Sequence, residues 1–413
     1  MSWEYIKAEE YCDSVRDGTH DTPKPVENGY KLVTGKHIKE GRIIPDDAYF
    51  ISEKDYFKIC ERSKVEQWDV LMSMIGNGLG RTAVVDIVPD YAIKNIALFK
   101  IGDEVKSKWL HYYISSTVGQ SVIYNSLQGT GQPFISLNLL RNMQIPSPPH
   151  STMKKIVDIL SKYDDLIENN QKQIKLLEEA AQRLYKEWFV DLRFPGHENT
   201  KIVDGVPEGW RKRTVEECLS FHSNGGWGKE EPLGKYEYSG KVIRGTDINN
   251  VKSGDFSNLP LRYHTEKDVV SRSLRKNDIV FELSNGNINN IGRSLLITDY
   301  ILKNCGKNTI CASFCKMFRP LDLIHAIVLY LEIQDMQNSG RMLPFKKQGA
   351  NGINNFAFEE FLQHELLISN DNFNLDIFIN IFNDISVLQS KLTILKEARD
   401  RLLPKLMSGE LEV

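Results

Sequence analysis

Apolar residues recur every three or four positions along two long stretches of the chain, which is the spacing of one face of an α-helix. The first stretch opens at Ser151, a suitable N-cap just after Pro148-Pro149, and ends near Pro195-Gly196. Its seam positions are Met153, Ile156, Leu160, Tyr163, Ile167, Asn170, Ile174, Leu177, Ala181, Leu184 and Trp188. The second seam consists of Phe378, Ile381, Ile385, Leu388, Leu392, Leu395, Arg399, Leu402 and Leu406. The pattern therefore predicts two long helices.

These seams favour pairing of the two helices with each other, because a sustained heptad stripe with charged flanks is narrower than the stripe of a helix on a globular core. Asn170 and Arg399 interrupt the seams, and polar seam residues commonly fix register. The alternative, in which each helix packs on its own domain, stays open. An antiparallel coiled coil would carry two domains to opposite ends of a rod of about 42 Å. This length is similar to one turn of DNA, which is about 34 to 36 Å.

Short strand-like runs and shorter helices fill the rest of both halves. The pattern predicts an α+β fold for each, with strands and then one helix in each half, at residues 70–74, 82–85, 96–99 and 108–116, and at 279–283, 294–297, 309–311 and 325–335.

The two halves also resemble each other in sequence. At an offset of about 210 residues, DYAIKN at 90–95 matches DYILKN at 299–304, and 34–38 matches 244–248. Asp69 falls on Asp278, Gly80-Arg81 falls on Gly292-Arg293, and the helices match around Leu177 and Leu395. Tyr91 and Tyr300, shared by both halves, are expected in the cores. We expect domains at 1–150 and 196–372, with helices at 151–195 and 373–413, and a bipartite ligand.

Composition narrows the picture only a little. A chain of 413 residues exceeds one ordinary core, and its 41% hydrophobic content suffices for packed domains. No apolar run approaches the roughly 20 residues of a membrane span, and no secretory signal is visible, so we expect a cytoplasmic protein without a membrane partner. The net charge of -3 does not indicate a nucleic-acid binder. Cys305, Cys311 and Cys315 are the one cysteine cluster, without an evident fourth zinc ligand.

Enzyme motifs are weak. Asp90 followed by Glu104-Val105-Lys106 has the residue types of a metal-dependent nuclease, but the second half offers no matching Glu-x-Lys beside Asp299. The segment 76–80 is too short for a nucleotide-binding glycine loop, and no GxxxxGK[ST] segment is present. A non-catalytic chain is expected, with a metal-dependent nuclease and a duplicated coiled-coil scaffold that binds protein as alternatives.

Several segments resemble the specificity (S) subunits of bacterial type I restriction-modification systems. They are DGTHDTP at 17–23, the strand and proline lead at 138–149, WFVDLRFPG at 188–196, VPEGW at 206–210 and LLPKLMSGEL at 402–411. The resemblance covers essentially the whole chain. It implies two target recognition domains that read the halves of an interrupted double-stranded DNA sequence, with the helices as spacers.

The same resemblance implies partners and cofactors. Two methyltransferase (M) subunits would dock on the helices and use S-adenosylmethionine to methylate adenine N6. Restriction (R) subunits, which use ATP and Mg²⁺, would bind through them. This chain itself would hold no cofactor.

Polar side chains that could contact phosphates or base edges gather in glycine-marked loops of both domains. We select as DNA-binding candidates Lys36, His37, Asn77, Arg81, Thr130 and Gln132 in the first domain, and Arg244, Asn285, Asn287, Arg293, Lys346, Lys347, Gln348 and Asn351 in the second. His37 is also interpreted as a surface histidine, and the repeated Arg81 and Arg293 as scaffold.

Overall fold

Both amphipathic stretches fold as long helices in the computed structural model, α6 (His150–Tyr185) and α12 (Asp376–Ser408). The structure describes residues 3–39, 41–125, 127, 133–349, 352–369 and 375–413. These residues form two units, one of residues 1–166 and 395–413 and the other of residues 167–394. Each long helix therefore begins in one unit and ends in the other, so the four-part division expected from the sequence stays a prediction.

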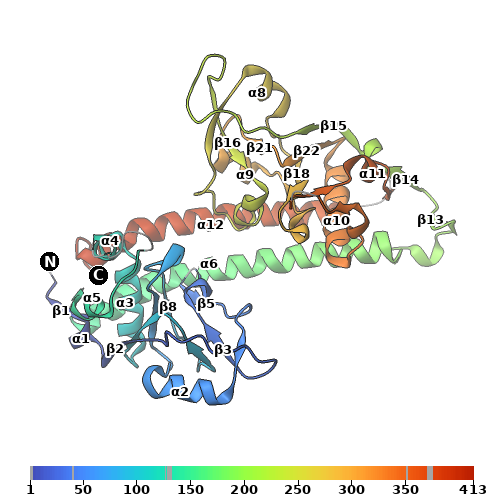
Figure 1. Cartoon of the computed structure of the whole chain (residues 1–413). Coiled ribbons are helices and arrows are strands. Elements are labelled where there is room, and N and C mark those ends of the chain that lie inside the picture. Colours follow the sequence, from blue (N-terminus) through green and yellow to red (C-terminus); the bar gives the residue numbers. More distant parts are fainter. Residues whose placement is uncertain (1–2, 40, 126, 128–132, 350–351, 370–374) are drawn as a thin grey trace. The chain divides into compact units, whose positions relative to one another are not determined.

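The first unit mixes short strands and helices, with the strands of its sheets between α2 and the first turns of α6 (Figure 1). Its elements before α6 are β1 (Tyr5–Lys7), α1 (Ala8–Tyr11), β2 (Ser14–Asp17), β3 (Tyr30–Val33), β4 (Ile38–Lys39), β5 (Arg42–Ile43), β6 (Phe50–Ile51), α2 (Glu53–Ser63), β7 (Val70–Ser73), β8 (Thr82–Val84), β9 (Tyr91–Ile93), β10 (Ile96–Lys100), α3 (Glu104–Ser115), α4 (Thr117–Asn125), α5 (Leu137–Asn142) and β11 (Gln144–Pro146).

The second unit has the same α+β character. Its elements between the long helices are β12 (Ile202–Val203), β13 (Val206–Pro207), β14 (Trp210–Thr214), β15 (Leu219–Asn224), β16 (Tyr238–Ile243), α7 (Ile248–Lys252), β17 (Leu261–His264), α8 (Glu266–Arg272), β18 (Ile279–Glu282), β19 (Ser284–Asn285), β20 (Ser294–Leu296), α9 (Asp299–Cys305), β21 (Ile310–Cys311), β22 (Cys315–Pro320), α10 (Leu323–Ser339), β23 (Lys346–Lys347), β24 (Asn354–Phe356), α11 (Phe358–Leu362) and β25 (Glu365–Ser369).

The strand order confirms the duplication. A four-stranded sheet has the order β2-β10-β7-β8 in the first unit and β15-β22-β18-β20 in the second. A three-stranded sheet with one parallel pair follows the same rule, as β6-β3-β9 and β17-β16-β21. The pairs β1-β11 and β14-β25 complete the correspondence. The strands and helices predicted from periodicity are thus present in both units.

A buried ion pair is repeated with the sheets. The Asp69 carboxylate lies 2.8 Å from Lys100 Nζ, and the Asp278 carboxylate lies 2.8 Å from Arg319 Nη2. Both aspartates are 1% exposed, and each also accepts a backbone N–H bond from the turn before its strand. The sequence match of Asp69 with Asp278 therefore marks a true structural equivalence.

The most obvious sequence match is not such an equivalence. DYAIKN contains strand β9, whereas DYILKN lies in helix α9, so similar residues adopt different structures in the two units. The partner of β9 is β21, because both pair in parallel with the matching strand β3 or β16. The third strand-like runs of the two halves, 96–99 and 309–311, which their order in the sequence would match, are therefore not equivalent, since β10 corresponds to β22. Tyr91 and Tyr300 are nevertheless both buried, as expected.

The two long helices pair antiparallel within each unit, which confirms the predicted coiled coil (Figure 1). In the first unit, the start of α6 shares one core with the end of α12, through Met153, Ile156, Leu160, Leu403 and Leu406. Arg399 Nη1 donates to Asp164 Oδ1 at 2.9 Å across this pair, so a polar seam residue has a specific partner.

In the second unit the opposite ends of the helices meet. Trp188, in a π-helical segment at Lys186–Val190 that extends α6, lies 5.3 Å from the Phe378 ring near the start of α12. Asn170 is also buried in this unit. No helix within the described ranges is long and apolar enough to cross a membrane.

The partly buried His111 on α3 predicts a pH-dependent stability. Its Nδ1 lies 2.8 Å from Thr82 Oγ1, and burial lowers the pKa of His111 from 6.5 to about 4. Below about pH 6.5 the His111 ring therefore binds a proton in the unfolded chain, whereas in the folded chain it stays neutral until the pH approaches about 4. We expect this group to lower the free energy of unfolding of the wild-type chain by roughly 2 kcal/mol between pH 7 and pH 5.

The measurement is urea unfolding across that pH range for the wild type and for His111→Asn, which keeps a polar atom near Thr82 but does not titrate. The variant should lose less stability as the pH falls. Equal losses in both proteins would contradict the assignment.

Candidate nucleic-acid interface

An equivalent turn in each unit carries the first group of candidates. In the first unit the backbone N–H of Thr34 donates to His37 Nδ1 at 2.8 Å, and in the second the N–H of Arg244 donates to Asp247 Oδ2 at 2.9 Å. His37 therefore occupies the place of Asp247 and closes the turn. It is 1% exposed, and burial lowers its pKa. The interpretation of His37 as a surface histidine is wrong, because the turn needs its ring as an acceptor.

The cations beside these two turns differ in how firmly other residues of the protein hold them. Lys36 is exposed, and its ammonium group lies 2.8 Å from the equally exposed Asp47. Arg244 donates through Nε and Nη2 to Asp247, which is 3% exposed, and also to the carbonyl of Asn258. The hydrogen bonds with Asp247 raise the pKa of Arg244. Lys36 can thus move to a phosphate at little cost, whereas Arg244 is held by its own turn.

The matched arginines Arg81 and Arg293 stand in different surroundings. Arg293 Nε donates to Glu282 Oε2 at 2.7 Å, and Glu282 is 2% exposed. A Cβ at Gly245 would lie 2.0 Å from Glu282 Oε1, so glycine is needed to make room for this carboxylate. In the first unit Ser73 stands in the place of Glu282, and Arg81 is exposed. Arg293 is therefore a structural cation, while Arg81 faces solvent.

The second unit gathers several candidates on a three-stranded polar sheet of order β19-β24-β23. Asn285 on β19 is held there: its Nδ2 donates to Glu282 Oε1 at 2.7 Å, and its Oδ1 accepts from the Asn287 N–H at 2.8 Å. Asn287 in turn accepts from the Asn289 N–H through its side chain. The Asn285 amide is thus occupied within the protein.

Strand β23 supplies the basic residues of this sheet. Lys346 is partly buried, and burial lowers its pKa. Lys347 is exposed and lies 3.3 Å from Glu360, and the next residue, Gln348, is exposed as well. Thr130, Gln132 and Asn351 lie outside the described residues. Asn77 belongs to a short turn at Gly76–Gly78, and its side chain is likewise outside the description.

Sequence reasoning missed three polar residues of the same sheet, Ser284, Asn354 and Asn355. Strands of two or three residues are too short to show alternation, and asparagine is depleted in strands, so no local pattern marks them. The sequence offered one signal for this sheet, which is that β19 directly follows the strongly apolar strand β18.

An aromatic cluster supports the polar sheet from beneath. The Phe356 ring on β24 lies 4.8 Å from Phe281 and 5.2 Å from Phe361, and Phe281 stacks on Phe318 at 5.3 Å. Aromatic contacts of this kind add stabilisation beyond the buried area. The sheet is therefore fixed to the core of its unit although its strands are short.

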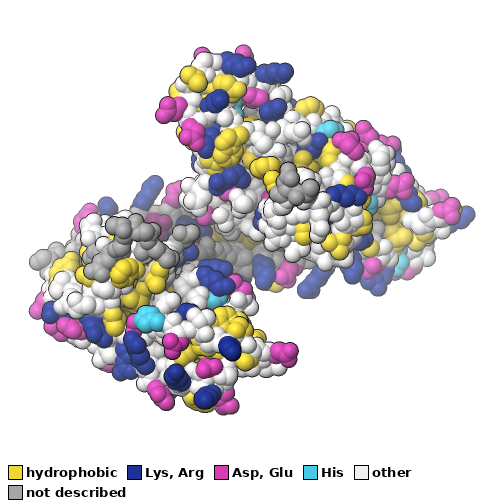
Figure 2. Space-filling view, viewed as in Figure 1, with side chains coloured by type: hydrophobic (Ala, Val, Ile, Leu, Met, Phe, Trp, Pro, Cys, Tyr) yellow, Lys and Arg dark blue, Asp and Glu magenta, His cyan; other side chains and the backbone are white. Residues whose placement is uncertain are grey.

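Charges are mixed on the viewed surface of both units. Figure 2 shows Lys and Arg side chains interspersed with Asp and Glu, without one continuous basic stripe. This agrees with the net charge of -3. Any binding of nucleic acid by these faces must rest on particular side chains rather than on bulk charge.

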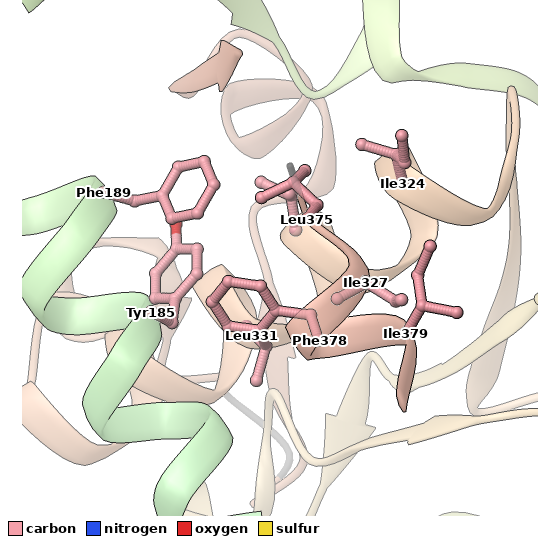
Figure 3. A pocket seen from close by; sticks show the side chains of 9 residues that line it. Tyr185, Phe189, Ile324, Ile327, Leu331, Leu375, Phe378 and Ile379 are labelled. Atoms are coloured by element: carbon pink, nitrogen blue, oxygen red, sulfur yellow. The ribbon is translucent and has the colours of Figure 1, made fainter. Parts of the chain in front are cut away.

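A small apolar pocket of the second unit lies where the long helices meet. Figure 3 shows Tyr185 and Phe189 of the first long helix and its extension near Leu331 and Phe378. The Tyr185 hydroxyl donates to Glu332 Oε2 at 2.6 Å, and Arg341 and His364 also contact this carboxylate. These hydrogen bonds help lower the pKa of Glu332 to about 2 against the opposing effect of burial. The pocket thus belongs to the seam between α6, α10 and α12.

The residues of the nuclease alternative have other contacts. Asp90 is exposed, Glu104 lies 2.6 Å from Lys108, and Lys106 lies over the Tyr11 ring at 5.6 Å. Within the described part of the chain, no group of three or more His, Cys, Asp or Glu side chains is placed to hold a metal ion.

Comparison with known proteins identifies relatives over most of the chain. The family model for the type I restriction modification DNA specificity domain matches residues 2–179. The MjaIX specificity subunit of Methanocaldococcus jannaschii is 25% identical over 339 residues, which cover 75% of this chain and 70% of that protein. The MjaVIII subunit of the same organism is 24% identical, and the match covers 68% of this chain and 64% of the relative. The HindI subunit of Haemophilus influenzae is 31% identical over 136 residues, 32% of this chain and 29% of that one.

A solved structure has the same fold. The S subunit of a type I restriction-modification system from M. genitalium superposes with a TM-score of 0.54 at 15% sequence identity. The match covers 98% of this chain and 96% of that one. The likeness therefore extends over both units and both long helices.

The contrast between the two arginines predicts different losses of stability. Arg293→Ala leaves the buried Glu282 carboxylate without its cation, so we expect the free energy of unfolding to fall by about 3 kcal/mol. Arg81→Ala, at the matching exposed position, should change it by less than about 0.5 kcal/mol. Urea unfolding followed by circular dichroism measures both. Similar losses for the two variants would contradict a structural role that is specific to Arg293.

Proposed function

The chain belongs to the specificity subunits of type I restriction-modification systems, and from this we infer that each of its two units reads one half of a bipartite DNA target. The observation that carries the proposal is the duplicated strand order, closed in each unit by the same pair of antiparallel helices. Two copies of one fold on a shared pair of helices suit a target made of two separate short sequences. Such a protein confers sequence preference and leaves the chemistry to its partners.

Recognition would divide between positioning and reading. Phosphate contacts from exposed cations fix the register of a protein on the duplex, while side chains in the major groove distinguish base pairs. Among the candidates, Lys36, Arg81, Lys347 and Gln348 are exposed and suited to contacting DNA. His37, Arg244, Asn285 and Arg293 would act indirectly, because their polar groups hold the turns and strands that present these side chains.

The catalytic steps would belong to partner subunits in the cytoplasm. We propose that two methyltransferase subunits dock on the paired helices and supply S-adenosylmethionine for methylation of adenine N6. Restriction subunits would join through them and use ATP and Mg²⁺. This chain would contribute binding energy and geometry only.

The paired helices would set the gap between the half-sites. The 36 residues of α6 form an unbroken α-helix from the first unit into the second, and buried side chains line its seam. A continuous helix resists bending, so its length in residues would be converted into a preferred length of DNA.

Binding should depend on both salt and sequence. We expect the purified chain, in complex with its methyltransferase partner, to lose roughly 10³-fold in DNA affinity between 50 and 200 mM salt. The reason is that binding releases salt cations from the DNA phosphates, and a higher salt concentration opposes that release. Gel-shift titrations with target and scrambled duplexes measure this. Affinity insensitive to salt would favour the protein-binding scaffold, and Mg²⁺-dependent cutting by the chain alone, abolished in Asp90→Ala, would favour the nuclease.

Shortening the helices should change the gap and spare the half-sites. Removal of one heptad from α6 shortens it by about 10 Å, which corresponds to about three base pairs. Removal of the facing heptad from α12 at the same time keeps the antiparallel seam in register. Methylated adenines in genomic DNA from cells with each version report both half-sites and the gap. An unchanged gap in the doubly shortened protein would contradict the spacer role.

A further inference from the structure

One position of the fold is built alike in both units and carries different chemistry in each. In the first unit Ile75 forms an isolated bridge with Phe134, and the next N–H, of Ile135, donates to Met74 O at 3.1 Å. In the second unit Ser284 pairs with Asn355, and the N–H of Phe356 donates to Leu283 O at 2.9 Å. The backbone register is therefore the same, and we call this position the variable bridge.

The side chains at the variable bridge reach solvent. Ile75 is 37% exposed and Phe134 is 39% exposed, which is unusual for two facing apolar residues. In the second unit the same two places hold Ser284 and the exposed Asn355. The scaffold below is repeated, so the outward side chains at this point are free to differ between two units that must read different sequences.

Asn355 is oriented by its neighbour across the strands. Ser284 Oγ donates to Asn355 Oδ1 at 2.7 Å, so the amide plane is set and Nδ2 is directed away from Ser284. An amide oxygen has two lone pairs, so Oδ1 keeps one for a ligand. The side chain thus presents one donor and one acceptor side by side.

The strand that carries Asn355 is held in place by packing, and a lysine lies on the neighbouring strand. The next residue, Phe356, is buried in the aromatic cluster, which fixes the strand. Lys347 faces Asn355 from the third strand, so Ser284, Asn355 and Lys347 form a row across the polar sheet. The major groove of DNA admits a two-stranded β-ribbon, and β24 with β23 forms such a ribbon.

The other asparagines of the sheet are already engaged. Asn354 donates through Nδ2 to the carbonyl of Gly286 at 2.9 Å, and Asn285 is bonded to Glu282. Neither presents a complete amide to solvent. Asn355 is therefore the asparagine of β19, β24 and β23 best placed to meet a ligand.

We propose that Asn355 reads an adenine in the half-site of the second unit, through a bidentate pair of hydrogen bonds to N6 and N7, and that Ser284 is its positioning residue. An amide matches adenine in this way in the major groove. Lys347 contacts the flanking backbone phosphate after leaving Glu360. The inference rests on the proposed function and names the specificity-determining residue of one domain.

The test uses the complex of the full chain with its methyltransferase subunits and a duplex library randomised in both half-sites. Asn355→Ala should reduce discrimination at one adenine–thymine pair of one half-site by roughly 10- to 100-fold. Preference at the other half-site should stay unchanged. Asn383→Ala, which removes an exposed asparagine from α12 in the same unit, is the matched control and should alter neither half-site.

Two further variants keep the test sharp. Asn355→Asp retains an acceptor for Ser284 but loses the amide donor, so preference at the same base pair should move from adenine towards cytosine, whose N4 amino group donates. Ser284→Ala should weaken discrimination at that pair, and Ser284→Thr, which keeps the hydroxyl, should restore it. A merely structural contribution of Ser284 would not act on a single base pair. Thermal unfolding confirms that each variant is folded.

The outcomes separate this inference from the broader proposal. If the wild-type complex shows sequence preference and both Asn355 variants keep it, or lose affinity equally for all sequences, the assignment of Asn355 is overturned and the specificity function stands. If the wild-type complex shows no sequence preference, the proposed function itself fails.

Discussion

Burial of the apolar seam of the two long helices is the constraint on which both units depend. In the first unit, Met153 and Leu160 of α6 and Leu406 of α12 belong to the same core as Trp109 of α3. In the second, Trp188 and Phe378 meet at the opposite ends of the helices. The helices therefore contribute buried side chains to both units. A change of their register would therefore disturb the packing of both units.

The sequence predicts the long helices and most of the strands because their signals are local. A heptad seam or an apolar run such as β7 is visible within a few residues of sequence. Local signals also mislead in one case. The matching hexapeptides at 90–95 and 299–304 form a strand and a helix, because the parallel partner in each unit is chosen by the surrounding sheet and not by the hexapeptide. Sequence similarity therefore identified the duplication correctly in general, but at 90–95 and 299–304 it matched two segments of different structure.

The candidate interface could be predicted only by region. Buried partners decide which polar residues are free. Glu282 holds its near neighbours Asn285 and Arg293, but that this carboxylate is buried and needs a glycine at 245 to admit it follows only from the fold. His37 is inward because its ring takes the place of a capping carboxylate. The match of 34–38 with 244–248 aligns His37 with Asp247, but the inward direction of the ring follows only from the fold. Composition therefore indicates polar loops, while the division between contact and scaffold follows from the fold.

Repetition of the scaffold explains how two different readers can be carried by one architecture. The equivalent ion pairs Asp69–Lys100 and Asp278–Arg319 are buried, so replacement of one partner would cost several kcal/mol. At the variable bridge the backbone bonds are made whatever the side chains are, because the neighbouring N–H and carbonyl groups fix the register. Side chains there can change without loss of the fold. If the proposed role of this position holds, stability and specificity would depend on different residues of the same strands, and each unit could acquire a new sequence preference separately.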